Sequence, residues 1–224
     1  MPVPAPRARV PSMEGRDPAA AEQSAALARL AETVRALVRA TVTTSAPAGA
    51  LDAAATDLDT IVRRLEAHVG ATPVPRYPTL VPPPGEPADL MPYDFVLGRL
   101  NPLAPPLGFA WEGGRTVAHV TYGTPYEGPP GCVHGGVIAA AFDQVLSLAN
   151  VANGAAGPTA KLALRFRRPT PLHVPVRYEG WQTHVAGRRL HVEGRLLVDG
   201  EVTVEADGVF VSMPHDRVMR MLDR

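Results

Sequence analysis

The chain has 224 residues, and its 22 basic and 22 acidic side chains leave it without net charge. That balance argues against a nucleic-acid binder that relies on electrostatics, because such proteins normally carry a basic excess. The one cysteine, Cys132, excludes an intrachain disulfide and favours a reducing compartment. The proline-rich N-terminus does not resemble a secretory signal, and no stretch approaches the ~18 apolar residues of a membrane span. We therefore expect a cytoplasmic protein without a membrane span.

The first 70 residues are predicted to form a helical hairpin behind a disordered tail of residues 1–16. Asp17 and Pro18 supply an N-cap and a first-turn proline, and the first helix is expected to end near residue 41. A second helix is expected from about residue 50 to 69, where Gly70 is placed to terminate it. Its apolar side chains recur at helical spacing: Leu51, Leu58, Ile61, Val62 and Leu65. The hairpin of residues 17–70 is either a docking or oligomerisation arm or, as we favour, packed on its own domain.

A single α+β domain is predicted for residues 93–214, between a polyproline-like linker of residues 71–92 and a C-terminal tail of residues 215–224. The linker carries eight prolines. Beyond it, apolar periodicity and turn residues predict two strands, one long helix and four further strands: 109–111, 115–121, 135–150, 159–167, 174–185, 189–198 and 202–213. One helix followed by a run of antiparallel strands indicates a helix packed on a single sheet.

The start of the predicted helix, GCVHGGVIAAAFDQ at residues 131–144, combines two glycines with one acid. Helical geometry places Gly136 and Asp143 on one face of small residues. The first amides of a helix have no intrahelical acceptor, and glycines there let a ligand's carbonyl oxygen approach closely. Gly135 and Gly136 are therefore candidate oxyanion donors, with Asp143 as the candidate base or nucleophile.

Gly136 and Asp143 cannot both serve one carbonyl group from a single helix. They are seven residues apart, or about 10.5 Å along the axis at 1.5 Å per residue, whereas reacting atoms approach to roughly 3–3.5 Å. Two antiparallel copies of the helix around a two-fold axis would bring the start of one to the middle of the other. The site is therefore expected to require a homodimer.

The run EGPPGCVHGGVIAAAFDQ, followed by PTAKLALRFRRPTPL, resembles the hotdog-fold acyl-CoA thioesterases of the PaaI and THEM4-like group. Their pattern is a Gly/Pro loop, His-Gly-Gly, an acid nine residues after the histidine, and Thr or Ser at the start of the next strand. In this sequence these residues are His134, Asp143 and Thr159. The resemblance covers roughly residues 94–213 and says nothing about the N-terminal hairpin.

The resemblance implies a hotdog fold, an antiparallel sheet wrapped around the long helix, in homodimers that often pair to tetramers. The Gly136 amide, with that of Gly135 as a second donor, would polarise the thioester carbonyl. Asp143 of the other subunit would activate water or attack directly, Thr159 would orient the water, and His134 would shape the loop rather than act as a base. The family uses no metal and no cofactor, because CoA is part of the substrate. Three points stay open. They are the identity of the acyl group, whether the thiol carrier is CoA or an acyl carrier protein, and whether the assembly is a dimer or a tetramer.

Each of these roles has a purely structural alternative. Asp143 could be a satisfied carboxylate buried at a dimer seam, and the glycine pair could only allow two helices to cross closely. Thr159 is the weakest catalytic candidate, because strand alternation turns it away from the apolar side that faces the helix. That conclusion holds unless Gly157-Pro158 bends the start of the strand.

Two groups of arginines are candidates to bind the phosphates of CoA, which arginine can contact bidentately. Arg165, Arg167 and Arg168 lie at the end of the strand that follows the helix, and Arg188 and Arg189 lie in a later turn. The alternative is that the first group only protects an exposed strand edge from pairing with another edge.

Other chemistries and function classes are less consistent with the sequence. The side chains of Cys132 and His134, two residues apart in an extended loop, point apart, which argues against a thiol nucleophile. The remaining histidines lack metal-ligand spacing, so no metal site is expected. A hydratase of this fold would carry a histidine where Ala104 follows Asn101-Pro102-Leu103. The two classes that stay open are an acyl-CoA thioesterase and a non-catalytic acyl-CoA-binding or scaffold protein of the same fold.

Overall fold

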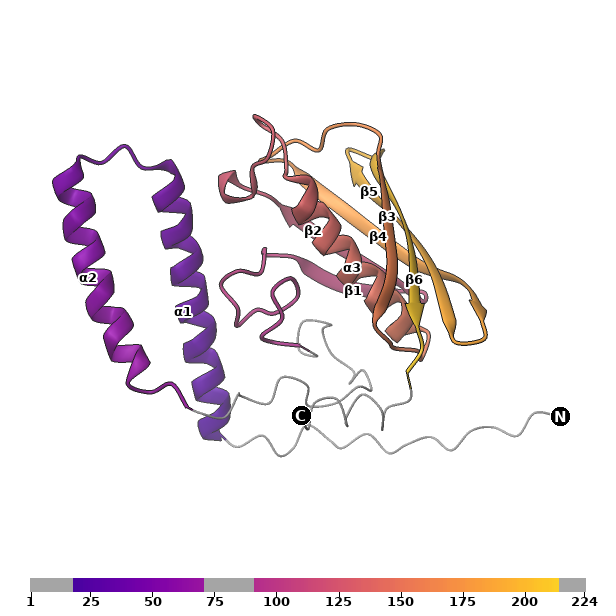
Figure 1. The fold of residues 1–224 in the computed structure, drawn as a ribbon, viewed down its shortest axis with the longest axis horizontal. Helices are drawn as coiled ribbons and strands as arrows, with labels where there is room; N and C mark the ends of the chain where they lie inside the picture. Colours follow the sequence, from indigo (N-terminus) through magenta and orange to yellow (C-terminus); the bar gives the residue numbers. More distant parts are fainter. Residues whose placement is uncertain (1–17, 71–90, 214–224) are drawn as a thin grey trace.

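A computed structural model describes residues 18–70 and 91–213 (Figure 1). The expected N-terminal tail, the N-cap at Asp17, nearly all of the proline-rich linker and the C-terminal tail lie outside these residues. Two helices, α1 (Pro18–Thr43) and α2 (Ala48–Glu66), precede the domain. The domain comprises β1 (Gly108–Glu112), β2 (Arg115–Thr121), the 3₁₀ turn η2 (Thr124–Tyr126), α3 (Gly135–Ala152), β3 (Thr159–Phe166), β4 (Pro175–Ala186), β5 (Arg189–Val198) and β6 (Glu201–Val211). The predicted helices and strands are all present, with ends within three residues of the expected ones.

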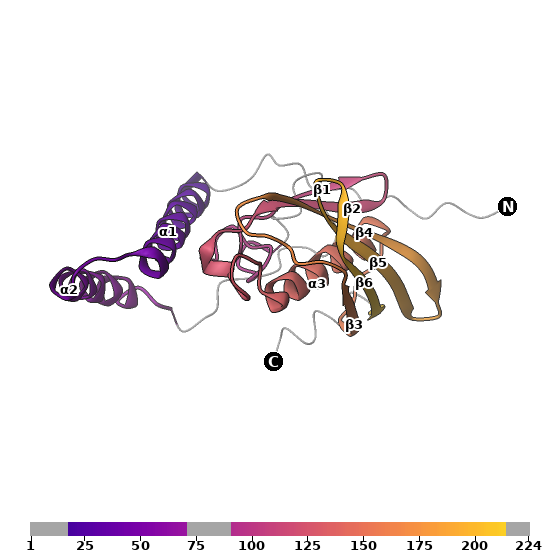
Figure 2. The same ribbon diagram turned by 90° about the horizontal axis from the view of Figure 1, so that it is seen from above.

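The strands form one six-stranded sheet in the order β1-β2-β4-β5-β6-β3. Every neighbouring pair is antiparallel. The connection from β2 to β3 therefore crosses the sheet from one side to the far edge, and α3 is the element that makes this crossing. Figures 1 and 2 show α3 lying along one face of the curved sheet, and β3 forms the edge beside it.

Apolar side chains of α3 fill the space between helix and sheet. Those that are buried include Ile138, Ala141, Phe142, Val145, Leu146 and Leu148. Glycines on the strands let the helix approach this closely: a Cβ at Gly180 would lie 2.7 Å from Val145 Cγ1, and one at Gly194 would lie 3.0 Å from Leu146 Cδ2. Gly180 and Gly194 are cross-strand partners on β4 and β5. Both strands therefore lack a side chain at the point where the helix crosses them.

α3 corrects the expectation that no segment is long and apolar enough to cross a membrane. Among the described residues, Gly135–Ala152 meets that criterion by length and composition. Half of this segment is buried inside the protein. Its apolarity is explained by the sheet that it covers, because a core helix meets the same criterion.

A pair of tyrosines forms a polar contact within the core. The hydroxyls of Tyr122, after β2, and Tyr178, on β4, lie 2.9 Å apart, and both side chains are fully buried. Burial raises the pKa of both phenols well above the ordinary value. Each hydroxyl therefore stays protonated and serves as the hydrogen-bonding partner of the other.

The two N-terminal helices differ in how they meet the domain. α1 contacts η2 and buries Ala31, so the favoured prediction of a hairpin packed on its own domain describes α1. It does not describe α2, in which no residue is buried. Figure 2 shows α1 lying between α2 and the rest of the molecule. α2 also ends at Glu66 rather than near the expected residue 69, because the chain continues into a turn in which the amide of His68 donates to the Leu65 carbonyl.

Candidate active site

The loop before α3 is closed by its own hydrogen bonds. Glu127 Oε1 accepts a 2.7 Å bond from the amide of Gly131, and Glu127 and Val133 form an isolated bridge. Gly131 has a φ of 71°, a conformation that glycine adopts without strain. At the end of the loop, the His134 amide donates a 2.9 Å bond to the Tyr126 carbonyl. The first turn of α3 is thereby fixed to η2.

His134 caps the helix with its side chain. Its Nδ1 accepts a 2.9 Å hydrogen bond from the amide of Gly136, so the ring engages in a local contact. The amide of Gly135, by contrast, makes no hydrogen bond within the described residues. Of the two predicted oxyanion donors, Gly135 is open, and Gly136 becomes available when the His134 ring turns away.

Asp143 and Thr159 are brought together in the structure. Asp143, in the middle of α3, accepts a 2.7 Å hydrogen bond at Oδ1 from the hydroxyl of Thr159 at the start of β3. The expectation that strand alternation turns Thr159 away from the helix is therefore wrong. The pair joins the acid of the motif to its hydroxyl within one protomer.

A β-bulge accounts for this orientation of Thr159. Thr159 pairs with Phe210 of β6, whereas Lys161, two residues later, pairs with Val209 only one residue away. The additional residue, Ala160, shifts the alternation by one position. Thr159 consequently shares the core side of the sheet with the buried Phe210, which simple alternation could not predict.

The segment before β3 is held against the end of β6. A Cβ at Gly157 would collide with the carbonyl of Val211, so the close approach of the two backbones requires glycine. The Val211 amide donates to the Pro158 carbonyl at 3.0 Å, and the Met213 amide donates to the Ala156 carbonyl at 3.0 Å. These contacts fix where β3 begins, although the reversal of Thr159 comes from the bulge and not from a bend at Gly157-Pro158.

The face of α3 that carries Asp143 is incompletely covered by its own sheet. Gly136 is exposed, and Ala140, Asp143 and Ser147 are half-buried. Asp143 and the helix-start amides remain about 10.5 Å apart along this face by helical rise. One protomer therefore brings Asp143 to Thr159 but not to Gly135 or Gly136.

Phe166, which the sequence analysis did not single out, lies at the helix start. A Cβ on Gly135 would meet Phe166 Cζ at 3.3 Å, so the ring borders the glycine amide. The side chain is nevertheless 53% exposed. An aromatic residue that continues the apolar side of β3 beyond the half-buried Leu164 is the signal that could have identified it.

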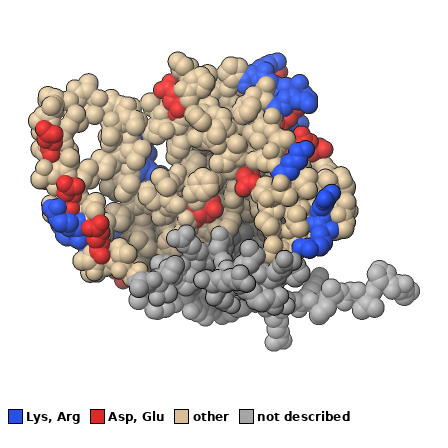
Figure 3. All heavy atoms as spheres, viewed as in Figure 1, with Lys and Arg blue, Asp and Glu red and all other residues tan. Residues whose placement is uncertain are grey.

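The first arginine group is already engaged with acids on β6. Arg167 donates from Nε and Nη2 to Glu205 Oε2 at 3.0 and 2.7 Å, and Arg165 lies 4.0 Å from the same carboxylate. Arg168 pairs with Glu201 at 3.0 Å. Figure 3 shows basic and acidic side chains lying beside one another on the visible face. Because these pairs are exposed and such pairs are weak, a phosphate could still compete for the guanidinium groups.

The second arginine group lies at the opposite end of β3. Arg189 pairs in register with Val211 of β6, next to the residue that pairs with Thr159. Arg188 donates from Nε to the Ser212 carbonyl at 3.2 Å, and Arg189 forms no ion pair within the described residues. One protomer thus places the Arg188–Arg189 turn near Thr159, and the Arg165–Arg168 group near Gly135.

Residues 18–70 and 91–213 contain no group of three or more His, Cys, Asp or Glu side chains that could hold a metal ion. Cys132 is a free, half-buried thiol. It lies in the loop before the helix, where it forms a bridge with Pro171. The polar groups that the structure offers at the site are the carboxylate–hydroxyl pair and the helix-start amides.

Comparison with known proteins gives the family. The sequence profile of the thioesterase superfamily matches residues 130–205, which include the helix, β3 and the acid–hydroxyl pair. The crystal structure of a thioesterase superfamily protein is 36% identical to this chain, covers 83% of it and 94% of its own chain, and superposes with a TM-score of 0.74. The chain belongs to the thioesterase superfamily. Its sheet around one long helix is the hotdog fold of that superfamily.

Two mammalian acyl-coenzyme A thioesterases, both named THEM4, share a shorter region with this thioesterase superfamily chain. The mouse protein is 30% identical over 105 residues, which is 46% of this chain and 45% of the relative. The bovine protein is 31% identical over 105 residues, or 46% and 43%. The chain thus spans less than half the length of these relatives.

Proposed function

We propose that this chain is an acyl-CoA thioesterase, which hydrolyses acyl-CoA to a free acid and CoA in a site shared by two subunits. The observation that carries the proposal is the hydrogen bond between Thr159 and Asp143. It joins an acid and a hydroxyl from separate elements in a chain of the thioesterase superfamily. The names of the two mammalian relatives favour CoA as the thiol carrier.

The amide of Gly135 is the donor best placed to polarise the thioester carbonyl. It sits at the first position of α3, where the helix dipole favours developing negative charge, and it has no partner within the described residues. The Gly136 amide would add a second donor once His134 releases it. In this arrangement His134 acts as a cap on that amide and not as a base.

Asp143 of the second subunit then acts on the carbonyl carbon. As a base, it takes a proton from water, the water oxygen bonds to carbon, the carbon–sulfur bond breaks, and CoA leaves as the thiolate, which takes up a proton. As a nucleophile, its carboxylate oxygen bonds to the carbonyl carbon, the carbon–sulfur bond breaks, CoA leaves as the thiolate, which takes up a proton, and water then hydrolyses the acyl anhydride to the free acid and the carboxylate. The hydroxyl of Thr159 donates its proton to one oxygen of the Asp143 carboxylate. The lone pairs of that hydroxyl can then accept a hydrogen bond from the water and orient it.

The half-open face of α3 supports the assembly that this mechanism needs. The stripe from Gly136 to Ser147 is not covered by its own sheet, and an antiparallel second copy would cover it. Such a copy places the start of each helix beside Asp143 of the other. All groups in this mechanism belong to the protein or the substrate, so it requires neither a metal nor a cofactor.

The test is thioester hydrolysis across a panel of acyl-CoAs of increasing chain length, measured by free thiol release. Wild type is compared with Asp143→Asn, which keeps an acceptor for Thr159. We expect turnover in wild type and its collapse in the variant, at an unchanged dimer mass by light scattering. A folded dimer that binds acyl-CoA in calorimetry but releases no thiol from any of them would instead indicate the non-catalytic binding protein.

A single turnover in H₂¹⁸O identifies Asp143 as a nucleophile if the label enters the protein, whereas label in the released acid fits a base or attack of water on the acyl carbon of an anhydride. If Asp143 is a base, the label enters the released acid in the first turnover. If Asp143 is a nucleophile, the first product is unlabelled when water attacks the aspartyl carbon, and the label appears in the protein.

A further inference from the structure

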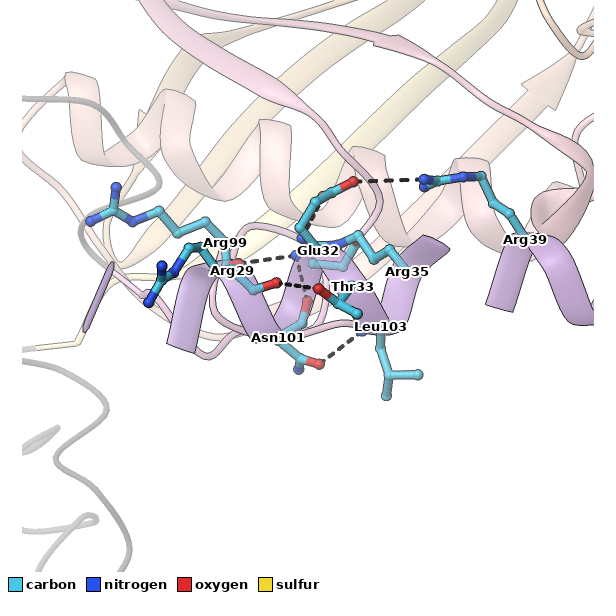
Figure 4. Close-up of polar contacts among 9 residues, drawn as sticks. Arg29, Glu32, Thr33, Arg35, Arg39, Arg99, Asn101 and Leu103 are labelled. Atoms are coloured by element: carbon cyan, nitrogen blue, oxygen red, sulfur yellow. Dashed lines mark hydrogen bonds and ion pairs between the residues drawn. The ribbon is translucent and has the colours of Figure 1, made fainter. Parts of the chain in front are cut away.

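One half-buried arginine ties α1 to the domain. The side chain of Arg35 is 11% exposed, and its guanidinium donates to three main-chain carbonyls (Figure 4). Nε reaches the Ala104 carbonyl at 3.1 Å, and Nη2 reaches those of Arg99 and Asn101 at 3.0 and 2.8 Å. The remaining nitrogen, Nη1, pairs with Glu32 at 3.2 Å. All three guanidinium nitrogens are therefore used within the protein.

The acceptors belong to an irregular segment, residues 98–107, that leads directly into β1. Asn101 stabilises it from within, because its side-chain amide donates to the Tyr93 carbonyl and its Oδ1 accepts from the Leu103 amide, both at 3.0 Å. Ala104 and Leu107 are buried. Carbonyls in such a segment lack strand partners and need others, and Arg35 supplies them from a residue more than 60 positions away in the sequence.

The same stretch of α1 also meets the loop that sets up the candidate active site. α1 contacts η2. Charged side chains of α1 interact electrostatically with Tyr126 of η2. Burial raises the pKa of Tyr126, and the nearby Arg35 and Arg39 oppose that rise. The carbonyl of Tyr126 holds the amide of His134, one residue before Gly135. The helix that Arg35 anchors thus contacts η2, and η2 holds the residue that precedes the open amide.

We propose that Arg35 is a positioning residue for thioester hydrolysis. By fixing α1 against residues 98–107 and η2, it sets the position of His134 and hence the direction of the Gly135 amide. α1 then contributes to catalysis by the domain and is not a separable arm. This inference rests on the proposed function for its kinetic effect, but the loop order that it predicts can be measured without turnover.

The test compares Arg35→Ala and Arg35→Lys with Arg39→Ala, a matched loss of charge one turn away at an exposed ion pair. Displacing a catalytic group by about 1 Å can cost 10²-fold in rate, so we expect Arg35→Ala to lower kcat roughly 10- to 100-fold with KM changed less than about threefold. Lysine should recover only part of kcat, because its ammonium cannot span three carbonyls. Arg39→Ala should retain wild-type kinetics.

Hydrogen exchange provides the readout that does not depend on activity. In Arg35→Ala, amides of residues 126–137 should exchange faster while those of β4 and β5 keep their protection. Wild-type kcat together with unchanged exchange in the loop would overturn the proposal. If Arg35→Ala does not fold, a folded Arg35→Lys with wild-type kcat would do so. If wild type hydrolyses no acyl-CoA, the proposed function fails, and loop exchange alone decides the positioning role.

An independent observation concerns α2, whose apolar side chains are exposed apart from Leu58, which is half-buried. Leu51, Ile61, Val62 and Leu65 are 43–49% exposed. Leu51, Leu58 and Leu65 recur every seven residues with Ile61 between them, which is the seam of a two-helix coiled coil.

The charges beside the seam indicate what covers it. Asp57 and Arg64 occupy equivalent positions one heptad apart. In an antiparallel pair with Leu58 of one helix opposite Ile61 of the other, each Asp57 faces Arg64 of its partner. A parallel pair would instead place Asp57 and Arg64 beside apolar Val62 and Val69. We infer that α2 pairs in antiparallel orientation with α2 of a second copy of this chain.

Cysteine cross-linking in the full chain tests this pairing. Chains with Leu58→Cys are mixed with chains with Ile61→Cys, both in a Cys132→Ser background, and oxidised gently. We expect a disulfide-linked dimer, whereas Thr56→Cys on the opposite face of α2 should stay largely unlinked. Cross-linking no faster than in the Thr56→Cys control would overturn the inference. Asp57→Arg should also slow the reaction, and adding Arg64→Asp should restore it.

Discussion

The hydroxyl of Thr159 lies 2.7 Å from Oδ1 of Asp143, which joins the first residue of β3 to the middle of α3. Thr159 gives its single proton to the carboxylate, so its lone pairs are left as acceptors. The second carboxylate oxygen accepts no hydrogen bond within the described residues. In the protomer Thr159 is exposed and Asp143 is half-buried.

Thr159→Val removes the hydroxyl while preserving the shape of the side chain. We expect kcat for acyl-CoA to fall roughly 10- to 100-fold, which is at or below the ~10²- to 10⁴-fold of a group that itself transfers the proton, with little change in stability at this exposed position. Thr159→Ser keeps the hydroxyl and should stay within a few-fold of wild type. Equal kcat values in steady-state assays of the Val and Ser variants would remove Thr159 from the mechanism.

Gly135→Pro deletes the open amide at a helix position where proline is tolerated. Loss of one oxyanion donor typically costs 10²- to 10³-fold in kcat, and we expect a loss of that order. Gly135→Ala is the matched control, because it keeps the amide although its Cβ lies close to Phe166. If Gly136→Pro alone abolished turnover and Gly135→Pro did not, Gly136 would be the donor and His134 would have to turn away from it.

Tyr122→Phe should destabilise the fold by about 1–3 kcal/mol, because it leaves the buried hydroxyl of Tyr178 without its partner. The double variant Tyr122→Phe/Tyr178→Phe removes both hydroxyls and should recover much of that loss. Urea unfolding of the two single variants and the double variant completes the cycle. Additive losses would show that the hydroxyls do not depend on one another.

Glu179→Gln should weaken the fold in a pH-dependent way. Burial raises the pKa of Glu179, but hydrogen bonds from Arg177 and Arg195 outweigh it and hold the pKa below its ordinary value of 4.5. A carboxyl group with a lowered pKa contributes its stability above pH 4.5 and loses it as the pH falls through the folded-state pKa.

We therefore expect the urea stability of wild type to exceed that of Glu179→Gln by about 1–2 kcal/mol at pH 7, with the difference shrinking below pH 4.5. Glu112→Gln is the control, since Glu112 bonds Arg177 from an exposed position and should cost less than about 1 kcal/mol. A difference that does not change with pH would show that the charge of Glu179 is not responsible.

The sequence alone predicted the parts of the molecule that depend on local patterns. Apolar periodicity located the helices and strands, and the spacing of His134 and Asp143 located the helix start and the acid. The bulge at Ala160 was missed because it is a shift in the pairing register between β3 and β6. The sequence of one strand does not reveal its register with another. Arg35 was missed for the same reason, since its acceptors come from a segment distant in the sequence.

The pairing of the arginines on β3 also depended on a partner strand. Arg167 and Arg168 appeared available for phosphates because Glu205 and Glu201 are more than 30 residues away in the sequence. The apolar stripe of α2 was recognised correctly as a helix face, but periodicity cannot say whether anything covers that face. Local patterns thus predicted elements and candidate groups, and left their partners undetermined.

The additional residue in β3 also bears on how such a protein could change over time. Deleting Ala160 would leave the six strands, the central helix and the apolar side chains of the core in place. Thr159 would then directly precede Lys161 and, by strand alternation, would keep its place opposite Phe210 on the core side of the sheet. A three-nucleotide deletion here would therefore shorten the chain without turning the hydroxyl away from the acid, whereas a re-pairing that removed the bulge but kept Ala160 would turn it away.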